Sequence, residues 1–194
     1  MSIFKSLGAH PSANTALLMR NLYFVRAAFA LVWALGLLSL IKMPALVPFL
    51  LILYPAFDAG SSFYDAYVHR ASKSTLAQKT NGVISFLTVL AVLIVLSMGV
   101  PAILRVFGVW AILTGGIELV TAIRRWKEFR GQAVLVFGGA VSVLAGSFFI
   151  ASAGQPTSGL SSLVGYALMG SWQFLFSALR LIKQARQNTQ TDLH

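Results

Sequence analysis

Apolar residues along the chain fall into six long runs separated by short polar segments. The runs cover residues 22–41, 45–68, 82–100, 102–123, 132–153 and 160–182. A helix needs about 20 residues to cross ~30 Å of hydrocarbon, and each run is close to that length. Leu, Ala, Val and Gly continue through the runs without the polar alternation that a membrane β-barrel requires. The pattern predicts an all-α membrane protein of six transmembrane helices.

Composition agrees with this prediction. The 194 residues are 57% hydrophobic and only 10% charged, which is unlike a soluble domain. The first run follows a 20-residue polar tail and is longer than the apolar part of a signal peptide, so we expect it to be retained. We therefore divide the chain into an amino-terminal tail (1–20), a six-helix transmembrane domain (21–186) and a carboxy-terminal tail (187–194).

Positive charge is distributed unevenly around the six runs, although the net charge is +10. Only Lys42 and Arg105 lie near one face of the expected bundle. The other basic residues lie in the tails, in the second and fourth loops, or at span ends beside them: Lys5, Arg20, Arg26, Arg70, Lys73, Lys79, Arg124, Arg125, Lys127, Arg130, Arg180, Lys183 and Arg186. The positive-inside rule then predicts that both termini are cytoplasmic. Topology alone accounts for these clusters, which could also bind anionic lipid headgroups; a nucleic-acid partner is not expected.

A repeat becomes visible when the sequence is shifted by 56 residues. Tyr54, Trp110 and Tyr166 then align. So do the small residues Ala59, Gly115 and Ser171, the small polar Asp65, Thr121 and Ser177, and Ala66, Ala122 and Ala178. This predicts three tandem helical hairpins, at about 19–74, 75–130 and 131–186. Because all three point the same way, we expect them to surround a pseudo-threefold axis along the membrane normal.

Polar residues follow the same repeat at helical spacing and occupy one face of the second, fourth and sixth helices. The three stripes are Tyr54, Asp58, Ser61 and Asp65; then Trp110, Thr114, Glu118, Thr121 and Arg125; then Tyr166, Gly170, Gln173 and Ser177. They have two interpretations. They are seams where helices pack closely through small and hydroxyl side chains, or they converge on the axis and line a water-filled cavity.

Charged residues within the spans need partners. Asp58 lies near the middle of its span and Glu118 in the inner half of its own, where an ionised carboxylate costs ~2.5–3.5 kcal/mol on insertion scales. Arg26 lies at a depth comparable with that of Glu118 and between those of Asp65 and Asp58. We therefore predict a buried ion pair between the first helix and the second or fourth. Such a pair either fixes helix register or serves function.

Backbone features predict two further details. Pro55 should remove a helical hydrogen bond and kink the second helix just before Asp58. Gly138, Ser142 and Gly146 form a ladder of small residues on the fifth helix, which favours a close helix contact within the chain or with a second copy.

Enzyme signatures are absent from the sequence. There is no HExxH, no GxSxG and no Gly-rich phosphate loop, and His10, His69 and His194 lie outside the spans. The lack of cysteine excludes disulfides, thiolate metal sites and cysteine nucleophiles. Asp58 and Asp65 are about 10 Å apart along one helix, too far to share a proton as a catalytic dyad. We expect a non-enzymatic protein without catalytic residues, metal or cofactor.

The second repeat carries a family resemblance. Its segment VFGVWAILTGGIELVTAIRRW, with Gly108, Trp110, Gly115, Gly116 and Glu118, and the following GGAVSVLAGSFFI resemble the HdeD-like short-repeat membrane proteins. The first repeat departs from that pattern, since YPAFDAGSSFYDAYVHR carries two prolines and two aspartates. The resemblance implies tandem two-helix repeats in the bacterial inner membrane and, by analogy, a part in acid resistance. It implies no catalytic or binding residues.

Two functions remain open from the sequence. In the first, the central polar face handles protons or a small solute during stress, and Arg26, Asp58 and Glu118 are the residues that carry it. In the second, the protein is a structural subunit whose exposed seams meet another membrane protein or a second copy of the chain.

Overall fold

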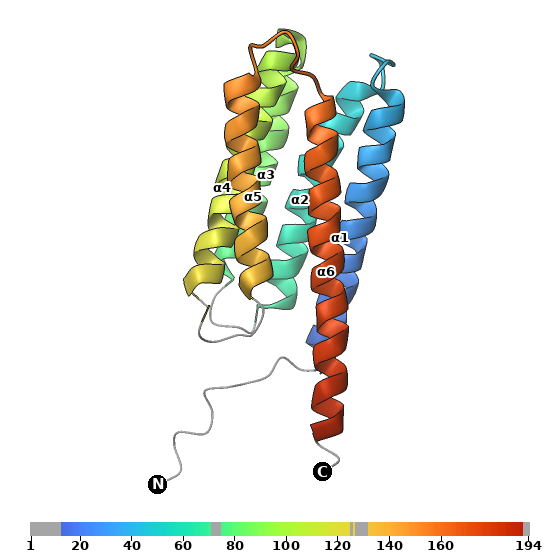
Figure 1. Cartoon of the computed structure of the whole chain (residues 1–194), viewed down its shortest axis with the longest axis vertical. Coiled ribbons are helices and arrows are strands. Elements are labelled where there is room, and N and C mark those ends of the chain that lie inside the picture. The colour runs from blue at the N-terminus through green and yellow to red at the C-terminus, as the bar shows by residue number, and fades with distance from the viewer. Residues whose placement is uncertain (1–12, 71–74, 125, 127–131, 192–194) are drawn as a thin grey trace.

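The structure is a computed structural model that describes residues 13–70, 75–124, 126 and 132–191. Its elements are α1 (Ala13–Leu40), α2 (Val47–Val68), α3 (Leu76–Val95), the 3-10 turn η1 (Leu96–Met98), α4 (Val100–Arg124), α5 (Gln132–Ser152) and α6 (Ser161–Thr191). Successive helices run antiparallel, so α1 begins and α6 ends at the same end of the bundle (Figure 1). We call this the terminal end. The predicted all-α fold is confirmed for the described ranges.

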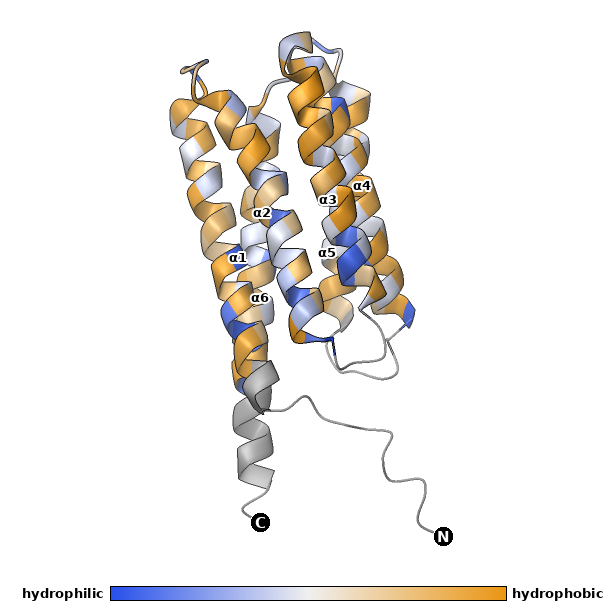
Figure 2. Cartoon of the chain, turned by 180° about the vertical axis from the view of Figure 1, so that it is seen from behind, coloured by the Kyte–Doolittle hydropathy of each residue, from blue (hydrophilic) through white to orange (hydrophobic). Residues whose placement is uncertain are grey.

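Five of these helices are long and apolar enough to cross a membrane. The candidate spans are Leu17–Leu40, Leu76–Met98, Val100–Arg124, Ala133–Ser152 and Ser161–Lys183. The sixth, α2, runs alongside them but is not among these spans, because its half near the terminal end is rich in polar residues. Large hydrophobic side chains such as Leu35, Phe86 and Leu144 are exposed on the outside of the bundle. Hydrophilic residues concentrate toward the terminal end (Figure 2). These features are typical of a multi-pass integral membrane protein.

Helix termini differ from the apolar runs because hydropathy marks only the part of a helix suited to hydrocarbon. Hydrogen bonding continues through polar residues, so α1 begins at Ala13 and α6 extends to Thr191. α2 stays helical through Pro55, which is buried. Gly99, with φ +85°, lies between η1 and α4 in the left-handed region that favours glycine.

Every helix packs against its neighbours in sequence, and α6 closes the ring against α1. The most extensive contacts join α4 to α5, α1 to α6 and α2 to α3, while the contact between α5 and α6 is much smaller. α4 and α5 approach so closely that a Cβ atom at Gly146 would lie 2.5 Å from the carbonyl oxygen of Gly108. A Cβ at Gly115 would lie 2.5 Å from the Cβ of Ser142. Glycine is therefore required where these two backbones meet.

The predicted small-residue ladder on α5 is thus confirmed as a contact within the chain for Ser142 and Gly146. Gly138 also makes its close contact within the chain, but with the side chain of Gln173 on α6 and not with α4. The glycine of α5 that contacts α4 at this level is Gly139, where a Cβ atom would lie 2.7 Å from the carbonyl oxygen of Gly115. Helical geometry explains the difference, since residues 139, 142 and 146 share one face and residue 138 is rotated toward α6.

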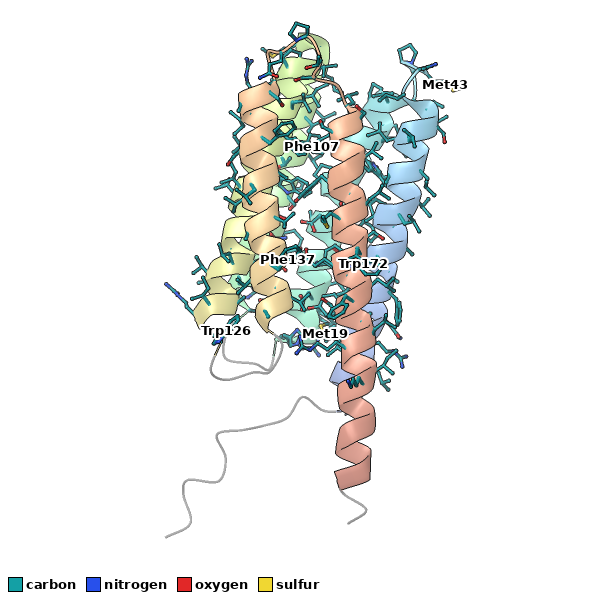
Figure 3. All side chains as sticks on the ribbon, in the orientation of Figure 1. Met19, Met43, Phe107, Trp126, Phe137 and Trp172 are labelled. Atoms are coloured by element: carbon teal, nitrogen blue, oxygen red, sulfur yellow. The ribbon has the colours of Figure 1, made fainter. Side chains whose placement is uncertain are left out.

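Away from the terminal end, the centre of the bundle is filled by apolar side chains. Those at most 3% exposed include Trp33, Leu37, Leu51, Leu104, Phe107, Phe149 and Leu163. Figure 3 shows Phe107 in the upper half of the bundle, well above Met19 near the lower end of α1. This half of the molecule has a closely packed apolar centre.

Candidate functional site

Three aromatic residues separate the apolar core from the other half of the bundle. Tyr54 of α2, Trp110 of α4 and Tyr166 of α6 are the residues that the 56-residue repeat aligns, and they meet near the centre. The ring centroids of Tyr54 and Trp110 are 5.6 Å apart and those of Trp110 and Tyr166 are 6.3 Å apart, both in edge-on geometry. Edge-on contacts of this kind are favourable for aromatic rings. We call these three residues the aromatic layer.

Between the aromatic layer and the terminal end lies a cavity of about 220 Å³ to which all six helices contribute. The predicted stripe and charged residues that line it are Arg26, Tyr54, Asp58, Asp65, Trp110, Thr114, Glu118, Thr121, Tyr166, Gly170, Gln173 and Ser177. Ser61 does not line the cavity. It is buried within α2, where its hydroxyl donates to the carbonyl oxygen of Asp58 at 3.1 Å. Arg125, the last residue of the second stripe, lies outside the described residues.

Asp58 is held by two donors from α3. The hydroxyl of Ser85 donates to its Oδ2 at 2.6 Å, and the Nδ2 of Asn81 donates to the same oxygen at 2.9 Å. Ser85 in turn accepts the indole N–H of Trp110 at 2.9 Å, which ties the carboxyl group to the aromatic layer. A carboxyl group that accepts short hydrogen bonds in a partly buried site is strongly positioned. Asp58 therefore links α2 to α3, and Ser85 extends the same hydrogen-bond network to α4.

Arg26 belongs to the same network. Its guanidinium donates to the hydroxyl of Ser62 at 3.1 Å, and Ser62 also accepts from Asn81 at 2.8 Å. The guanidinium carbon lies 5.4 Å from the centre of the Phe174 ring, within the range of a cation–π contact. The Nε of Arg26 is buried and has no hydrogen-bond partner in the described protein. This side chain therefore keeps an unsatisfied donor at the cavity wall.

Glu118 has a separate partner on the opposite side of the cavity. The Nε2 of Gln173 donates to its Oε1 at 2.6 Å, which joins α4 to α6. Gln173 is pressed against Gly138 of α5, and any side chain at that position would collide with it. Gly138 therefore leaves space for the Gln173 amide, which donates to Glu118. Nearby, the hydroxyl of Tyr166 donates to that of Ser142 at 3.4 Å.

The predicted contact ion pair between Arg26 and an acid is not formed. Among the described residues, the ion pair within 4 Å joins His69 to Asp65 at 2.8 Å, near the end of α2. Asp58 and Glu118 instead take neutral donors, and Arg26 takes a hydroxyl acceptor. The prediction used only depth along the helix. It did not account for the amide and hydroxyl groups that form hydrogen bonds with Arg26, Asp58 and Glu118.

Several residues of the site were not singled out from the sequence. Tyr23, Gln78, Asn81 and Ser85 line the cavity or bond to the residues that do. Asn81 and Ser85 are spaced i, i+4, which places both on one face of α3. This spacing could have identified a polar face on α3 from the sequence. The 56-residue repeat did not reveal it, because the polar stripes that the repeat aligns are on α2, α4 and α6.

The charge of the cavity follows from its lining. All three acidic residues within the described ranges line it, and Arg26 is the one arginine or lysine among the lining residues. Carboxyl groups thus outnumber the opposing cation, which favours protons or a positively charged ligand. No group of three or more potential metal ligands occurs in the described part of the chain.

In comparisons with known proteins, no protein-family model matches the chain, and no curated protein and no solved structure matches it. The resemblance to the HdeD-like proteins therefore stays a prediction from the quoted motifs.

Proposed function

We propose that this chain is a non-enzymatic, multi-pass membrane protein whose central cavity binds cations, either protons or a small positively charged solute, from the terminal end. The observation that carries the proposal is the convergence of Asp58, Asp65 and Glu118 on one cavity that is closed on one side by the aromatic layer. Asp65 is paired with His69, but Asp58 and Glu118 have only neutral hydrogen-bond donors, and an ionised acid costs several kcal/mol in hydrocarbon unless it is hydrated or paired.

The proposed membrane arrangement has six spans, with α2 as the span sheltered by its neighbours and both termini in the cytoplasm of a bacterial cell. Two observations support it. α2 runs antiparallel between α1 and α3 and has a length similar to theirs. The basic residues Arg20, Arg70, Arg124, Arg180 and Lys183 all lie toward the terminal end, as the positive-inside rule requires of a cytoplasmic face. Other members of the predicted basic set lie outside the described residues: Lys5, Lys73, Arg125, Lys127 and Arg130.

The proposed three-hairpin arrangement has its own support. Contacts around the ring alternate, because α2–α3, α4–α5 and α6–α1 are extensive while α1–α2, α3–α4 and α5–α6 are smaller. A pseudo-threefold axis would produce this alternation. It would also bring Tyr54, Trp110 and Tyr166 together, and the contacts between Tyr54 and Trp110 and between Trp110 and Tyr166 support this.

The cation site is tested by measuring how the purified protein, in phosphatidylcholine nanodiscs, binds tetramethylammonium and protons. Calorimetry should detect both, and Asp58→Asn combined with Glu118→Gln should weaken tetramethylammonium binding on the order of tenfold or more. Ser147→Ala is the control, because this exposed hydroxyl bonds only to its own helix at Val143. Unchanged binding in the double variant, or its absence in the parent protein, would reject the proposal. If no cation binds and a membrane protein co-purifies in fixed stoichiometry, the result would favour the alternative that the chain is a structural subunit.

A role in acid resistance is a further proposal, which follows from proton binding in the cavity and from the family resemblance. Cells carrying the double variant should then survive acid exposure no better than cells lacking the protein. Equal survival of parent and variant cells would remove this role without affecting cation binding itself.

A further inference from the structure

An apolar groove lies between α5 and α6, on the outer surface of the bundle beside the cavity. It has a volume of about 280 Å³ and is lined by Ala133, Val134, Phe137, Gly138, Val141, Met169, Trp172, Gln173 and Phe176. Phe137 is 61% exposed and Trp172 is 65% exposed. Figure 3 shows these two side chains at a similar level on the two helices. In a bilayer this groove would face the acyl chains.

The groove and the cavity share part of their walls. Gly138, Val141, Met169 and Gln173 line both. α5 and α6 also make the smallest contact of any two neighbouring helices in the ring, so the two backbones are packed least closely on this side of the cavity. Gln173 connects the two spaces chemically, because the amide that borders the groove donates to Glu118 inside the cavity. An apolar chain in the groove would thus place a polar head beside that acid.

We infer that the site takes an amphipathic cation, which reaches the cavity laterally from the bilayer with its apolar chain in the α5–α6 groove and its cationic head near Glu118. This rests on the proposed cation site and adds the ligand class and the route of access. Charge selects the head, because carboxyl groups outnumber Arg26 around the cavity. Tyr54, Trp110 and Tyr166 also line the cavity, and aromatic rings are favourable neighbours for a cationic head.

Three probes separate the contributions of head and chain. Tetramethylammonium carries the head alone, decyltrimethylammonium carries head and chain, and decyl sulfate carries the same chain with opposite charge. Binding is measured by calorimetry on protein in phosphatidylcholine nanodiscs, with empty nanodiscs subtracted to remove partition into lipid. Decyltrimethylammonium should bind on the order of tenfold more tightly than either of the other two. Equal binding of the two decyl compounds would overturn the inference and indicate a groove for lipid chains without selection of the head.

A matched pair of variants tests the groove itself. Phe137 and Phe148 are both on α5 and are 61% and 60% exposed, but only Phe137 lines the groove. Phe137→Gln should weaken decyltrimethylammonium binding on the order of tenfold and leave tetramethylammonium binding unchanged, while Phe148→Gln should change neither. Ala133→Trp, which fills the groove from an exposed position, should reproduce the effect.

The outcomes distinguish the two proposals. Tetramethylammonium binding that depends on Asp58 and Glu118 would support the cation site. If adding the decyl chain to the probe, or the variants Phe137→Gln and Ala133→Trp, then left affinity unchanged, the lateral route would be refuted and the cation site would stand. If no cation binds, both proposals fail. If the groove variants alter only self-association of the protein, the groove is an interface between two copies and the lateral route is refuted.

Discussion

Adjacent glycines on α4 offer a sharp test of the packing that frames the cavity. A Cβ atom at Gly115 would meet Ser142 Cβ at 2.5 Å and the carbonyl oxygen of Gly139 at 2.9 Å. A Cβ at Gly116 would meet nothing within 4 Å. Gly115→Ala and Gly116→Ala therefore make the same chemical change one residue apart, and only the first obstructs the approach of α5.

The size of the effect follows from these distances. Carbon atoms in ordinary contact are about 3.5–4.0 Å apart, so the methyl group added by Gly115→Ala would push α5 outward by up to roughly 1 Å. Overpacking of this kind costs about 1–3 kcal/mol. Both substitutions remove a helical glycine, which contributes up to ~1 kcal/mol of stability in each variant. Subtracting one variant from the other removes that shared gain, and the steric cost of about 1–3 kcal/mol remains as their difference.

Unfolding by sodium dodecyl sulfate in bicelles, followed by tryptophan fluorescence, measures this difference. Trp33 and Trp110 are buried and report on the core. Gly116→Ala should be as stable as the parent protein or more stable, and Gly115→Ala should be less stable than Gly116→Ala by the stated amount. Equal stability of the two variants would show that α4 and α5 do not meet through Gly115 in the membrane.

Two further predictions concern the polar network and the topology. Ser85→Ala should destabilise the protein by roughly 1–3 kcal/mol, because it removes one of the two donors to Asp58 and leaves the indole N–H of Trp110 without its partner. The same unfolding assay measures the change, and a change below about 0.5 kcal/mol would contradict the network. Reporter fusions at the two ends of the chain should both report the cytoplasm, and opposite locations would overturn the six-span arrangement.

Much of the arrangement could be predicted from the sequence because hydrophobic length and helical spacing act over single helices. The runs of apolar residues predicted the number of helices. The i, i+4, i+7 spacing grouped residues such as Tyr54 and Asp58, which line one cavity in the structure. The repeat aligned three aromatic residues that contact one another. Each of these patterns depends on the geometry of the helix alone.

Partner choice could not be predicted in the same way, because it depends on how each helix is rotated against its neighbour. The depth of Arg26 matched that of the acids, yet Ser62 lies within its reach and no carboxylate of the described residues does. Asp58 is bonded by Asn81 and Ser85, which are on the helix that follows it. α2 is not among the candidate spans because hydropathy counts its polar residues whatever they face, although Asp58, Ser62 and Asp65 line the cavity inside the bundle.

The absence of cysteine allows the central claim, a cavity accessible to water from one side only, to be measured directly. Thr114 lines the cavity and Leu104 lies in the apolar core, both on α4. Single variants Thr114→Cys and Leu104→Cys in sealed vesicles are treated with a membrane-impermeant cationic methanethiosulfonate from each side. The account predicts that Thr114→Cys reacts only from the side of the terminal end and that Leu104→Cys reacts from neither. Protection of Thr114→Cys from both sides, or equal reaction of the two cysteines, would contradict it.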